Sequence, residues 1–508
     1  MKYYITTPIY YINDKPHIGS AYTTIAADTL ARYHRLKGDE VFFLIGVDEN
    51  AQKNSDAAIA AGKGDAIQEY LDEQTAVWRA TWDALDISAT DFIRTTENRH
   101  KKGVNEFWKR VKEKGDIYKG TYTGYYCVGC EAFIRETDLV EGLCPDHKKK
   151  PEKIEEENYF FKCSAYRGLL LKHIEKHPDF IQPQSRKNEI IQYIKDHFED
   201  ISISRQSLKW GIPVPGDPTH VVYVWFDALI NYLTGVGFGD TEKGDVFEKW
   251  WPADLHLVGK DIIKFHCALW PAMLLSAGIP LPKHVFAHGF FTINGQKMSK
   301  TIGNVVDPLD VVKEYSRDAL RYFVLREIHF GADGDFSQRR LKERYSADLA
   351  KGLGNFVSRV ITMAENMNWS ACAVSPQDGD GMQAAETITE SWTKWEQGFL
   401  EYDFSLSLDA IWEVMSWGDW YIDMKKPWAL AKQNPSEARE VLALLLELVR
   451  QVAGMTHPFL PDTSRAILSS LGLKEDIFQK TPLNRYQVWQ GIALGNLHKG
   501  EALFPQKN

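Results

Sequence analysis

Cysteine is scarce in this sequence: there are six in 508 residues, and three of them fall within residues 127–144. So few cysteines cannot build a disulfide framework, and their scarcity favours a reducing, cytoplasmic location. Long apolar runs are also missing. None reaches the ~20 residues needed to span a bilayer, so we expect no membrane partner. Because residues 3–7 already resemble a core strand, we expect no signal peptide.

Positive charge is not in excess either, because 60 Lys and Arg stand against 69 Asp and Glu, for a net charge of −9. A protein that coats nucleic acid without specificity is usually basic, so this balance argues against that class. It does not exclude a specific RNA partner, because local patches decide such contacts. At about 150 residues per domain, the length predicts roughly three domains.

The first 46 residues predict a strand, a helix and a second strand. Residues 2–7 are rich in β-forming side chains, and residues 20–37 have apolar residues at helical spacing before Gly38 ends the helix. Residues 41–45 are a continuous apolar run, which is typical of a strand buried on both faces of a parallel sheet. The predicted fold class is therefore α/β, with a Rossmann-like, doubly wound parallel sheet.

Similar patterns return after residue 220, with strands expected at residues 221–225, 255–258 and 285–287. A helix is expected from Asp261 to about Gly278.

This interruption predicts a catalytic domain in two pieces, residues 1–116 and 220–290, with residues 117–219 as an insertion. Residues 345–508 have few strand patterns and predict an α-helical bundle. The strongest helical candidates are residues 345–365, 386–401, 406–424 and 436–455, and residues 375–381 are expected to form a loop.

Two short motifs are suited to binding phosphate. The first, Pro16-His17-Ile18-Gly19-Ser20, lies between the first strand and its helix, where a helix N-terminus favours anions. In the second, Asn294-Gly295 predicts a tight hairpin turn, and residues 296–301 then place two lysines three apart on a loop. Taken alone, the first is more typical of a structural histidine and the second of a solvated basic loop.

Together the two motifs resemble the HIGH and KMSKS signatures of class I aminoacyl-tRNA synthetases. Further segments resemble the methionyl-tRNA synthetase family in particular, and the resemblance covers essentially the whole chain. These segments are Tyr10-Tyr11-Ile12-Asn13, Gly46-Val47-Asp48-Glu49, Val224-Trp225-Phe226-Asp227-Ala228-Leu229 and Gly259-Lys260-Asp261-Ile262-Ile263-Lys264-Phe265-His266.

This resemblance implies a methionine–tRNA ligase. Such an enzyme activates L-methionine with Mg²⁺-ATP to methionyl-adenylate and transfers it to the 3′ end of tRNA(Met), including initiator tRNA, for initiation and elongation. Residues 291–344 would then hold the KMSK loop and contact the tRNA stem, and residues 345–508 would bind the anticodon. The resemblance assigns ATP binding to His17, Gly19, Ser20, Lys297, Ser299 and Lys300, of which His17, Lys297 and Lys300 are catalytic.

The resemblance also implies a methionine pocket, and the chemistry of its residues agrees. Asp48 suits the substrate ammonium, and Tyr11 and Trp225 suit a polarizable thioether. Taken alone, however, Trp225 is more typical of a core aromatic. The pocket residues implied are Ile9, Tyr11, Asp48, Trp225, Ala228, Leu229, Tyr232, Ile262 and His266, of which the last two are spaced i and i+4 on the predicted helix.

The chain departs from the family motifs at three places. Ser20 replaces the second histidine of HIGH, Asn50 and Ala51 stand where His and Gly are common, and Thr301 replaces the last serine of KMSKS. Threonine keeps the hydroxyl. Ser20 and Asn50 change the side-chain chemistry more than Thr301 does.

The insertion contains a pattern of metal ligands. Cys127 and Cys130 are followed, after 13 residues, by Cys144 and then His147. This spacing predicts a tetrahedral Cys₃His zinc site, and four protein ligands leave no open position, so the zinc would be structural. The isolated Cys163, Cys267 and Cys372 are expected to be buried packing residues.

In the helical region, the resemblance assigns anticodon recognition to Asn355, Arg359 and Trp428. An aromatic ring that stacks on an unpaired base is a common mode of RNA recognition. Taken alone, these residues are more typical of a helix-surface pair and a core tryptophan.

Rival functions fit less well. The insertion, about 100 residues long, is too short for the editing domain of leucyl, isoleucyl or valyl enzymes. A cysteinyl enzyme uses zinc inside its pocket, whereas this zinc has four protein ligands. A noncatalytic tRNA-binding paralogue would not need His17, Lys297 and Lys300. Since no strand-rich module follows residue 460, we expect a monomer.

Overall fold

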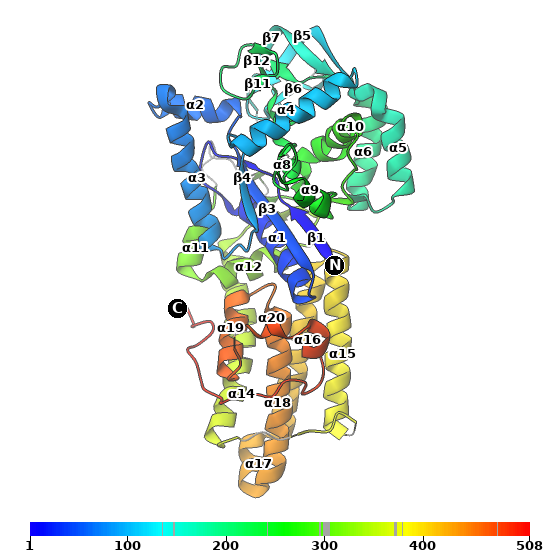
Figure 1. Ribbon diagram of the computed structural model, residues 1–508. Coiled ribbons are helices and arrows are strands. Elements are labelled where there is room, and N and C mark those ends of the chain that lie inside the picture. The colour runs from blue at the N-terminus through cyan, green and yellow to red at the C-terminus, as the bar shows by residue number, and fades with distance from the viewer. Residues whose placement is uncertain are drawn as a thin grey trace. The chain divides into compact units, whose positions relative to one another are not determined.

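The protein is described by a computed structural model that covers residues 1–134, 136–145, 148–240, 242–293, 296–297 (backbone only), 305–369, 373–377, 379–474 and 476–507. The chain forms two compact units (Figure 1). We call them the sheet unit, Lys2–Pro16 with Val41–His288, and the helical unit, Met1 and His17–Glu40 with Gly289–Asn508.

The sheet unit is organised around a seven-stranded sheet within the described residues, with the order β2-β3-β1-β13-β14-β8 and β4 beside β3. Pairing is parallel at β2–β3, β3–β4, β1–β13, β13–β14 and β14–β8. The strand order reverses at β1, and ligands of doubly wound sheets bind at the carboxyl ends beside such a point. The strands are β1 (Lys2–Thr6), β2 (Tyr10–Tyr11), β3 (Glu40–Asp48), β4 (Asp91–Arg94), β8 (Ile181–Gln182), β13 (Leu255–Gly259) and β14 (His284–His288).

Four of the predicted strands are confirmed as β1, β3, β13 and β14. The prediction at residues 221–225 is wrong. There β12 (Asp217–Val222) ends early and belongs to a separate sheet with β10 (Ser204–Arg205) and β11 (Pro213–Val214), and Trp225 lies in helix α7 (Val224–Ala228). The insertion also contributes β8 to the parallel sheet. Residues 117–219 are therefore not wholly separate from that sheet, in contrast to the sequence prediction.

The helix expected from Asp261 to about Gly278 is present as three consecutive segments of different helical type. A 3₁₀ turn (Lys260–Ile262) leads into a π-helical turn (Phe265–Leu269) and then into α10 (Trp270–Ser276). The remaining helices of this unit are α2 (Gln52–Ala60), α3 (Ile67–Ala84), α4 (Asn98–Glu113), α5 (Arg167–Lys176), α6 (Gln184–His197), α8 (Asn231–Thr234) and α9 (Gly244–Trp250), with 3₁₀ turns at Gly64–Ala66, Glu136–Asp138 and Cys163–Tyr166.

The insertion contains a second sheet in the order β6-β5-β7-β9. Its long antiparallel pair is β5 (Ile117–Cys127) with β7 (Glu152–Phe161), flanked by β6 (Ala132–Ile134) and β9 (Ile201–Ser202). Because β5 ends at Cys127, this sheet presents the cysteine segment at its end.

In the helical unit, the long helices α14, α15, α16 and α18 run side by side (Figure 1), which confirms the predicted bundle. The expected loop at residues 375–381 ends at Gly379, where α15 begins. The helices are α1 (Ile18–Leu36), α11 (Pro308–Glu314), α12 (Arg317–Arg326), α13 (Gln338–Arg344), a π-helix (Tyr345–Gly354), α14 (Asn355–Asn366), α15 (Gly379–Leu400), α16 (Phe404–Lys425), α17 (Pro427–Gln433), α18 (Pro435–Thr456), α19 (Pro461–Ser470), α20 (Ile477–Lys480) and α21 (Leu483–Tyr486).

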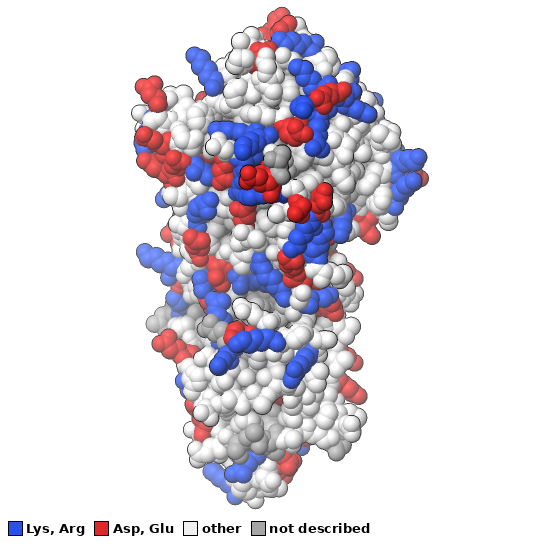
Figure 2. Space-filling view, in the orientation of Figure 1, with Lys and Arg blue, Asp and Glu red and all other residues white. Residues whose placement is uncertain are grey.

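On the face drawn in Figure 2, basic and acidic side chains are interspersed, in keeping with the near balance of charges in the sequence. Among the described residues, no helix combines the length and the apolar character that a membrane crossing needs.

A buried ion pair fastens α1 within the helical unit. Asp28 of α1 lies 2.8 Å from Arg321 of α12, and both side chains are fully buried. Arg321 also donates to the carbonyls of Phe459 (2.7 Å) and Pro458 (3.0 Å), and Arg32 donates to Asp28 at 2.7 Å. A charge that is buried must be paired and hydrogen-bonded, and this network meets that requirement.

We expect Arg321→Met to lower the unfolding midpoint, Tm, markedly. Removing one partner of a buried pair costs about 3–5 kcal/mol, because the other charge is left uncompensated. Arg339→Met is the control, since Arg339 is exposed and its i,i+4 pair with Glu343 is worth about 0.3–0.5 kcal/mol. Scanning calorimetry of both variants measures the difference, and equal losses of Tm would contradict the anchoring role.

Candidate functional site

The residues expected to form a methionine pocket lie in one apolar region of the sheet unit. Trp225, Leu229 and Tyr232 belong to a single buried cluster, and Ile9, Tyr11 and Ile262 pack against it. Ala228 is 5% exposed. The carboxyl ends of β3 and β13, together with α7, therefore bring together residues that are far apart in the sequence.

Asp48 is the acidic group of this region. It ends β3, directly opposite Tyr11 of β2, and is 1% exposed. Its Oδ1 accepts a hydrogen bond from the backbone N–H of Asn50 at 3.1 Å. Burial, and then the nearby charge of Asp227, raise the pKa of Asp48 well above its usual value. A bound ammonium would offset this cost.

A buried polar network next to Asp48 was not predicted. Asp227 of α7 accepts from Asn50 Nδ2 at 2.6 Å and contacts His100 Nε2 at 2.7 Å, and both Asp227 and His100 are fully buried. The other ring nitrogen of His100 lies 2.9 Å from the Thr234 hydroxyl. Asn50, the departure from the family motif, thus contacts both buried carboxylates: Asp48 through its backbone N–H and Asp227 through its side chain.

His266 is held as a neutral ring. Its Nδ1 donates to the Ile262 carbonyl at 3.0 Å, so Nε2 is left to accept from the Tyr232 hydroxyl at 2.8 Å. Burial lowers the pKa of His266 to about 4. Beside it, Trp225 stacks on Phe265 with ring centroids 3.8 Å apart. This wall of the pocket is aromatic and uncharged at neutral pH.

In the helical unit, His17 caps the N-terminus of α1. Its Nδ1 accepts from the N–H of Gly19 at 3.0 Å, and the Ser20 hydroxyl closes the cap by bonding the backbone of His17 on both sides. Ser20 therefore fixes the backbone of His17 and so orients its side chain. A Cβ at Gly19 would lie 2.9 Å from the His17 ring, so a larger residue there would displace that ring from the cap.

The second phosphate motif begins inside an antiparallel strand pair, so Lys297 lies in a strand and not on the expected loop. β15 (Phe291–Ile293) pairs antiparallel with β16 (Gln296–Lys297), and β17 (Gly334–Asp335) lies on its other side. The N–H of Ile18, at the start of α1, donates to the Val306 carbonyl at 3.0 Å. The chain just after the second motif is thus bonded to the first. The Asn294-Gly295 turn, the Lys297 side chain, Ser299, Lys300 and Thr301 lie outside the described residues.

Three cysteines of the insertion form a cluster able to bind a metal ion. The sulfur atoms of Cys127, Cys130 and Cys144 all lie within 4.8 Å of one another. The hydrogen bond that Cys130 shares with Cys127, together with burial, favours the protonated thiol and raises the pKa of Cys130 far above its usual value. Ionisation of all three thiols at this spacing would require a bound cation between them. The fourth expected ligand, His147, lies outside the described residues.

The other cysteines fit the expected packing role where they can be seen. Cys163 and Cys267 are fully buried, and the Cys163 thiol donates to the Glu199 carbonyl at 2.9 Å. Cys372 lies outside the described residues.

The residues expected to read an anticodon lie on α14 and α17. Asn355 is exposed, and Arg359 follows one turn later on the same helix. The guanidinium of Arg359 lies 5.6 Å from the ring centroid of Trp428 and pairs with Asp423 of α16 at 2.8 Å. Trp428 is 48% exposed, which corrects the reading of it as a core residue.

The backbone next to Trp428 has an unusual conformation. Lys426 joins α16 to α17 with φ 47° and ψ 61°, in the left-handed region, and Pro427 follows directly. Such a conformation in a non-glycine residue costs on the order of 1–3 kcal/mol and persists only where the surrounding structure imposes it.

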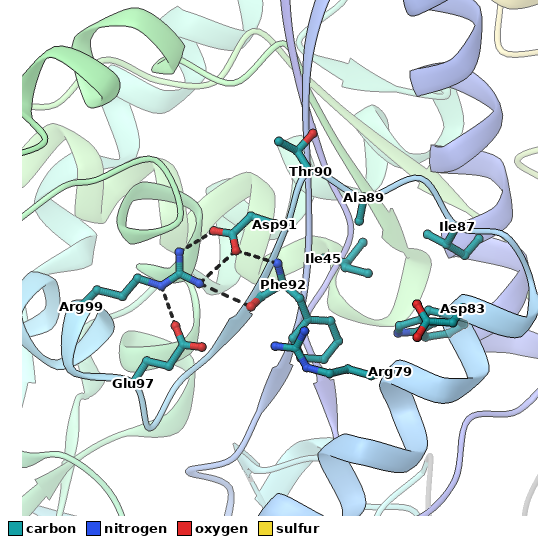
Figure 3. Close-up of a pocket in the computed structure, with 11 residues that line it drawn as sticks. Ile45, Arg79, Asp83, Ile87, Ala89, Thr90, Asp91, Phe92, Glu97 and Arg99 are labelled. Carbon is teal, nitrogen blue, oxygen red and sulfur yellow. Dashed lines mark hydrogen bonds and ion pairs between the residues drawn. The ribbon is translucent and has the colours of Figure 1, made fainter. Parts of the chain in front are cut away.

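A separate pocket, of about 460 Å³, lies beside β4 (Figure 3). Arg99 hydrogen-bonds Asp91 and Glu97 at its edge, and Arg79 lies over the Phe92 ring at 3.9 Å. None of the expected ATP-binding or methionine-binding residues lines it.

The doubly wound sheet, the helix capped by His17 and the bond from Ile18 to Val306 agree with the resemblance to class I aminoacyl-tRNA synthetases. A sequence model described as tRNA synthetases class I (M) matches residues 3–153 and 147–361, and one described as the anticodon binding domain of methionyl tRNA ligase matches residues 377–504.

Individual relatives agree. The chain is 47% identical to the methionine–tRNA ligase of Thermotoga maritima over 99% of this chain and 80% of that protein, and 41% identical to that of Streptomyces coelicolor over 99% and 96%. It superimposes with a TM-score of 0.94 and 38% identity on Mycobacterium tuberculosis methionyl-tRNA synthetase bound by methionyl-adenylate, covering 99% of this chain and 100% of that one. The chain belongs to the methionyl-tRNA synthetase family, and it is a methionine–tRNA ligase.

The raised pKa of Asp48 predicts how methionine binding depends on pH. If Asp48 receives the methionine ammonium, as expected, only the ionised carboxylate attracts it. Affinity should then be full above the pKa of Asp48 and fall as the pH drops through it, by about tenfold per unit below. Equilibrium binding of labelled methionine between pH 8 and pH 5 measures this.

Asp48→Asn should bind weakly at every pH in this range. Asp83→Asn, which changes an exposed carboxylate of α3, should follow the wild type. Wild-type affinity that is flat across the range would show that Asp48 is not the group that binds the ammonium.

Proposed function

We propose that the ligase reaction runs in two steps in this chain, with L-methionine, Mg²⁺-ATP and tRNA(Met), including initiator tRNA, as substrates. The methionine carboxylate attacks the α-phosphate of ATP, and pyrophosphate leaves. The 3′-terminal hydroxyl of the tRNA then attacks the adenylate carbonyl, and AMP leaves. The observation that carries this assignment is the buried Asp48 at the carboxyl end of β3, opposite Tyr11, which packs against the buried cluster that holds Trp225.

Methionine would be recognised by one buried charge and by the aromatic rings around it. Asp48 supplies the one strong electrostatic contact for the amino acid, to its ammonium. Tyr11 and Trp225 offer ring surfaces to the thioether, a contact worth about 0.3–1.5 kcal/mol. The neutral His266 has both ring nitrogens engaged, so it offers a polar substrate side chain nothing to bind. The full set proposed is Ile9, Tyr11, Asp48, Trp225, Ala228, Leu229, Tyr232, Ile262 and His266.

Phosphate binding is assigned to the start of α1. The helix N-terminus carries a partial positive charge, and His17 and Gly19 present the ring and the backbone there. Ser20 contributes to ATP binding through the cap that it closes around His17. Lys297, Ser299 and Lys300 complete the assignment, with the two lysines on the leaving pyrophosphate. The protein's contribution to the first step is therefore positioning and charge stabilisation.

We further propose that the metal of the cysteine cluster is zinc. Thiolate sulfurs select zinc among common divalent ions, and Cys127, Cys130, Cys144 and His147 would give the closed tetrahedral set of a structural site. Bound there, the ion would stabilise the folded insertion and take no part in the chemistry.

Metal analysis should give about one zinc per chain, and Cys144→Ser should lose it and lower Tm, because a structural zinc contributes folding energy directly. Cys163→Ser is the matched control: it replaces another buried cysteine, keeps a donor for the Glu199 carbonyl, and should retain the metal. A metal-free wild-type protein of unchanged Tm would contradict the structural role.

Recognition of the tRNA anticodon is assigned to Asn355, Arg359 and Trp428. Trp428 is half exposed in the free protein, as a ring that stacks on a base must be, and Arg359 stands beside it. We also propose that the enzyme acts as a monomer in the cytoplasm.

Two assays on the same variants separate activation from tRNA recognition. Trp428→Ala should leave ATP–pyrophosphate exchange unchanged, because that step needs no tRNA, and reduce kcat/KM for tRNA about 5- to 150-fold, since one stacked base is worth roughly 1–3 kcal/mol. His17→Ala should slow exchange itself by about 10²–10³-fold.

Trp420→Ala is the control for the anticodon assignment, because Trp420 is similarly exposed, at 51%, on α16. It should change neither assay. Equal losses in exchange and aminoacylation for Trp428→Ala would mean that Trp428 supports the fold.

A further inference from the structure

Lys53 lies beside Tyr11, one of the residues proposed to bind methionine, although no sequence motif points to Lys53. It is the second residue of α2, shortly after Asp48. Its Nζ lies 3.7 Å from the centroid of the Tyr11 ring and donates to the Gly129 carbonyl at 3.2 Å. A lysine cation above an aromatic face is attracted to it, so the ammonium holds the ring from one side.

The backbone of Lys53 is also fixed. Its N–H donates to Glu131 Oε1 at 2.8 Å, and Glu131 is fully buried. The Tyr126 hydroxyl donates to the other carboxylate oxygen of Glu131 at 2.6 Å, and the Tyr223 hydroxyl donates to the Glu131 carbonyl at 2.8 Å. Lys53 therefore cannot shift without disturbing a buried network, and its ammonium has a defined place.

The charge of Lys53 also bears on Asp48. The buried carboxylates of Asp227 and Glu131 oppose ionisation of Asp48, and the Lys53 ammonium favours it. Tyr11, also near Asp48, has its own pKa raised well above the usual value, chiefly by burial, so its hydroxyl stays neutral. Among these groups Lys53 is the cation that makes a negative Asp48 less costly before substrate arrives.

We infer that Lys53 is a positioning residue for methionine, which holds the Tyr11 ring in place and favours the ionised Asp48 that receives the substrate ammonium. This role rests on the proposed methionine site at Tyr11 and Asp48. It acts on substrate binding and leaves the phosphate chemistry to other residues.

The test replaces Lys53 in the full-length enzyme by methionine, which keeps the length and removes the charge, and by arginine, which keeps the charge. The rate of ATP–pyrophosphate exchange is measured as the concentration of methionine, and then that of ATP, is varied. Lys53→Met should raise KM for methionine roughly tenfold and change kcat and KM for ATP by less than about twofold. Lys53→Arg should recover most of the loss. Lys101→Met, an exposed substitution on α4, should match the wild type.

A second readout follows the charge directly. In Lys53→Met, the pH below which methionine affinity is lost should move upward, because Asp48 then ionises with less help. A general loosening of the fold would not move it in that direction. Should Lys53→Met fold poorly, the milder Lys53→Gln and a double-substitution cycle with Tyr11→Leu take its place, and the effect of Lys53→Gln should shrink when the ring is absent.

An unchanged KM for methionine in a folded Lys53→Met enzyme would overturn the proposal. So would a parallel rise in KM for both substrates that Lys53→Arg fails to correct. A wild-type protein without methionine-dependent exchange would instead overturn the proposed function itself, so the two failures are distinguishable.

Discussion

The parallel pairing of β1 with β13 is the contact on which the arrangement of the site depends. It places Ile5 opposite Leu255 and makes β1 the point where the strand order reverses. The residues that follow β13 then reach the same edge of the sheet as Asp48, at the end of β3. Parallel neighbours must be joined by long crossovers, so the chain can lengthen one crossover into a whole insertion and still close the sheet.

Much of the fold could be predicted because it follows local patterns. The strands β1, β3, β13 and β14 are apolar runs, and the long helices of the bundle have apolar residues at helical spacing. Trp225 was misplaced because a short apolar run does not distinguish a strand from a buried helix. The two-residue β8 is too short to carry any pattern, and its place in the sheet is set by tertiary pairing alone.

The candidate site was predictable where a motif is contiguous and obscure where it is assembled by folding. The motif around His17 and the spacing of Cys127, Cys130, Cys144 and His147 can be recognised in the sequence itself. The contacts of His100 with Asp227, and of Lys53 with Glu131, join segments far apart in the chain, and no sequence pattern marks them. Ser20 and Asn50, which depart from the family motifs, both proved to be hydrogen-bonded: one closes a helix cap and the other links two buried carboxylates.

The left-handed Lys426 has a consequence for the anticodon contact proposed at Trp428. Pro427 fixes its own backbone torsion, and Lys426 has little freedom ahead of it, so the chain entering Trp428 is confined before any base arrives. Conformational entropy that a mobile loop would lose on binding has already been lost on folding. More of the stacking energy of a preorganised ring then contributes to affinity. A base that does not fit gains little, because the ring cannot adjust its position to that base.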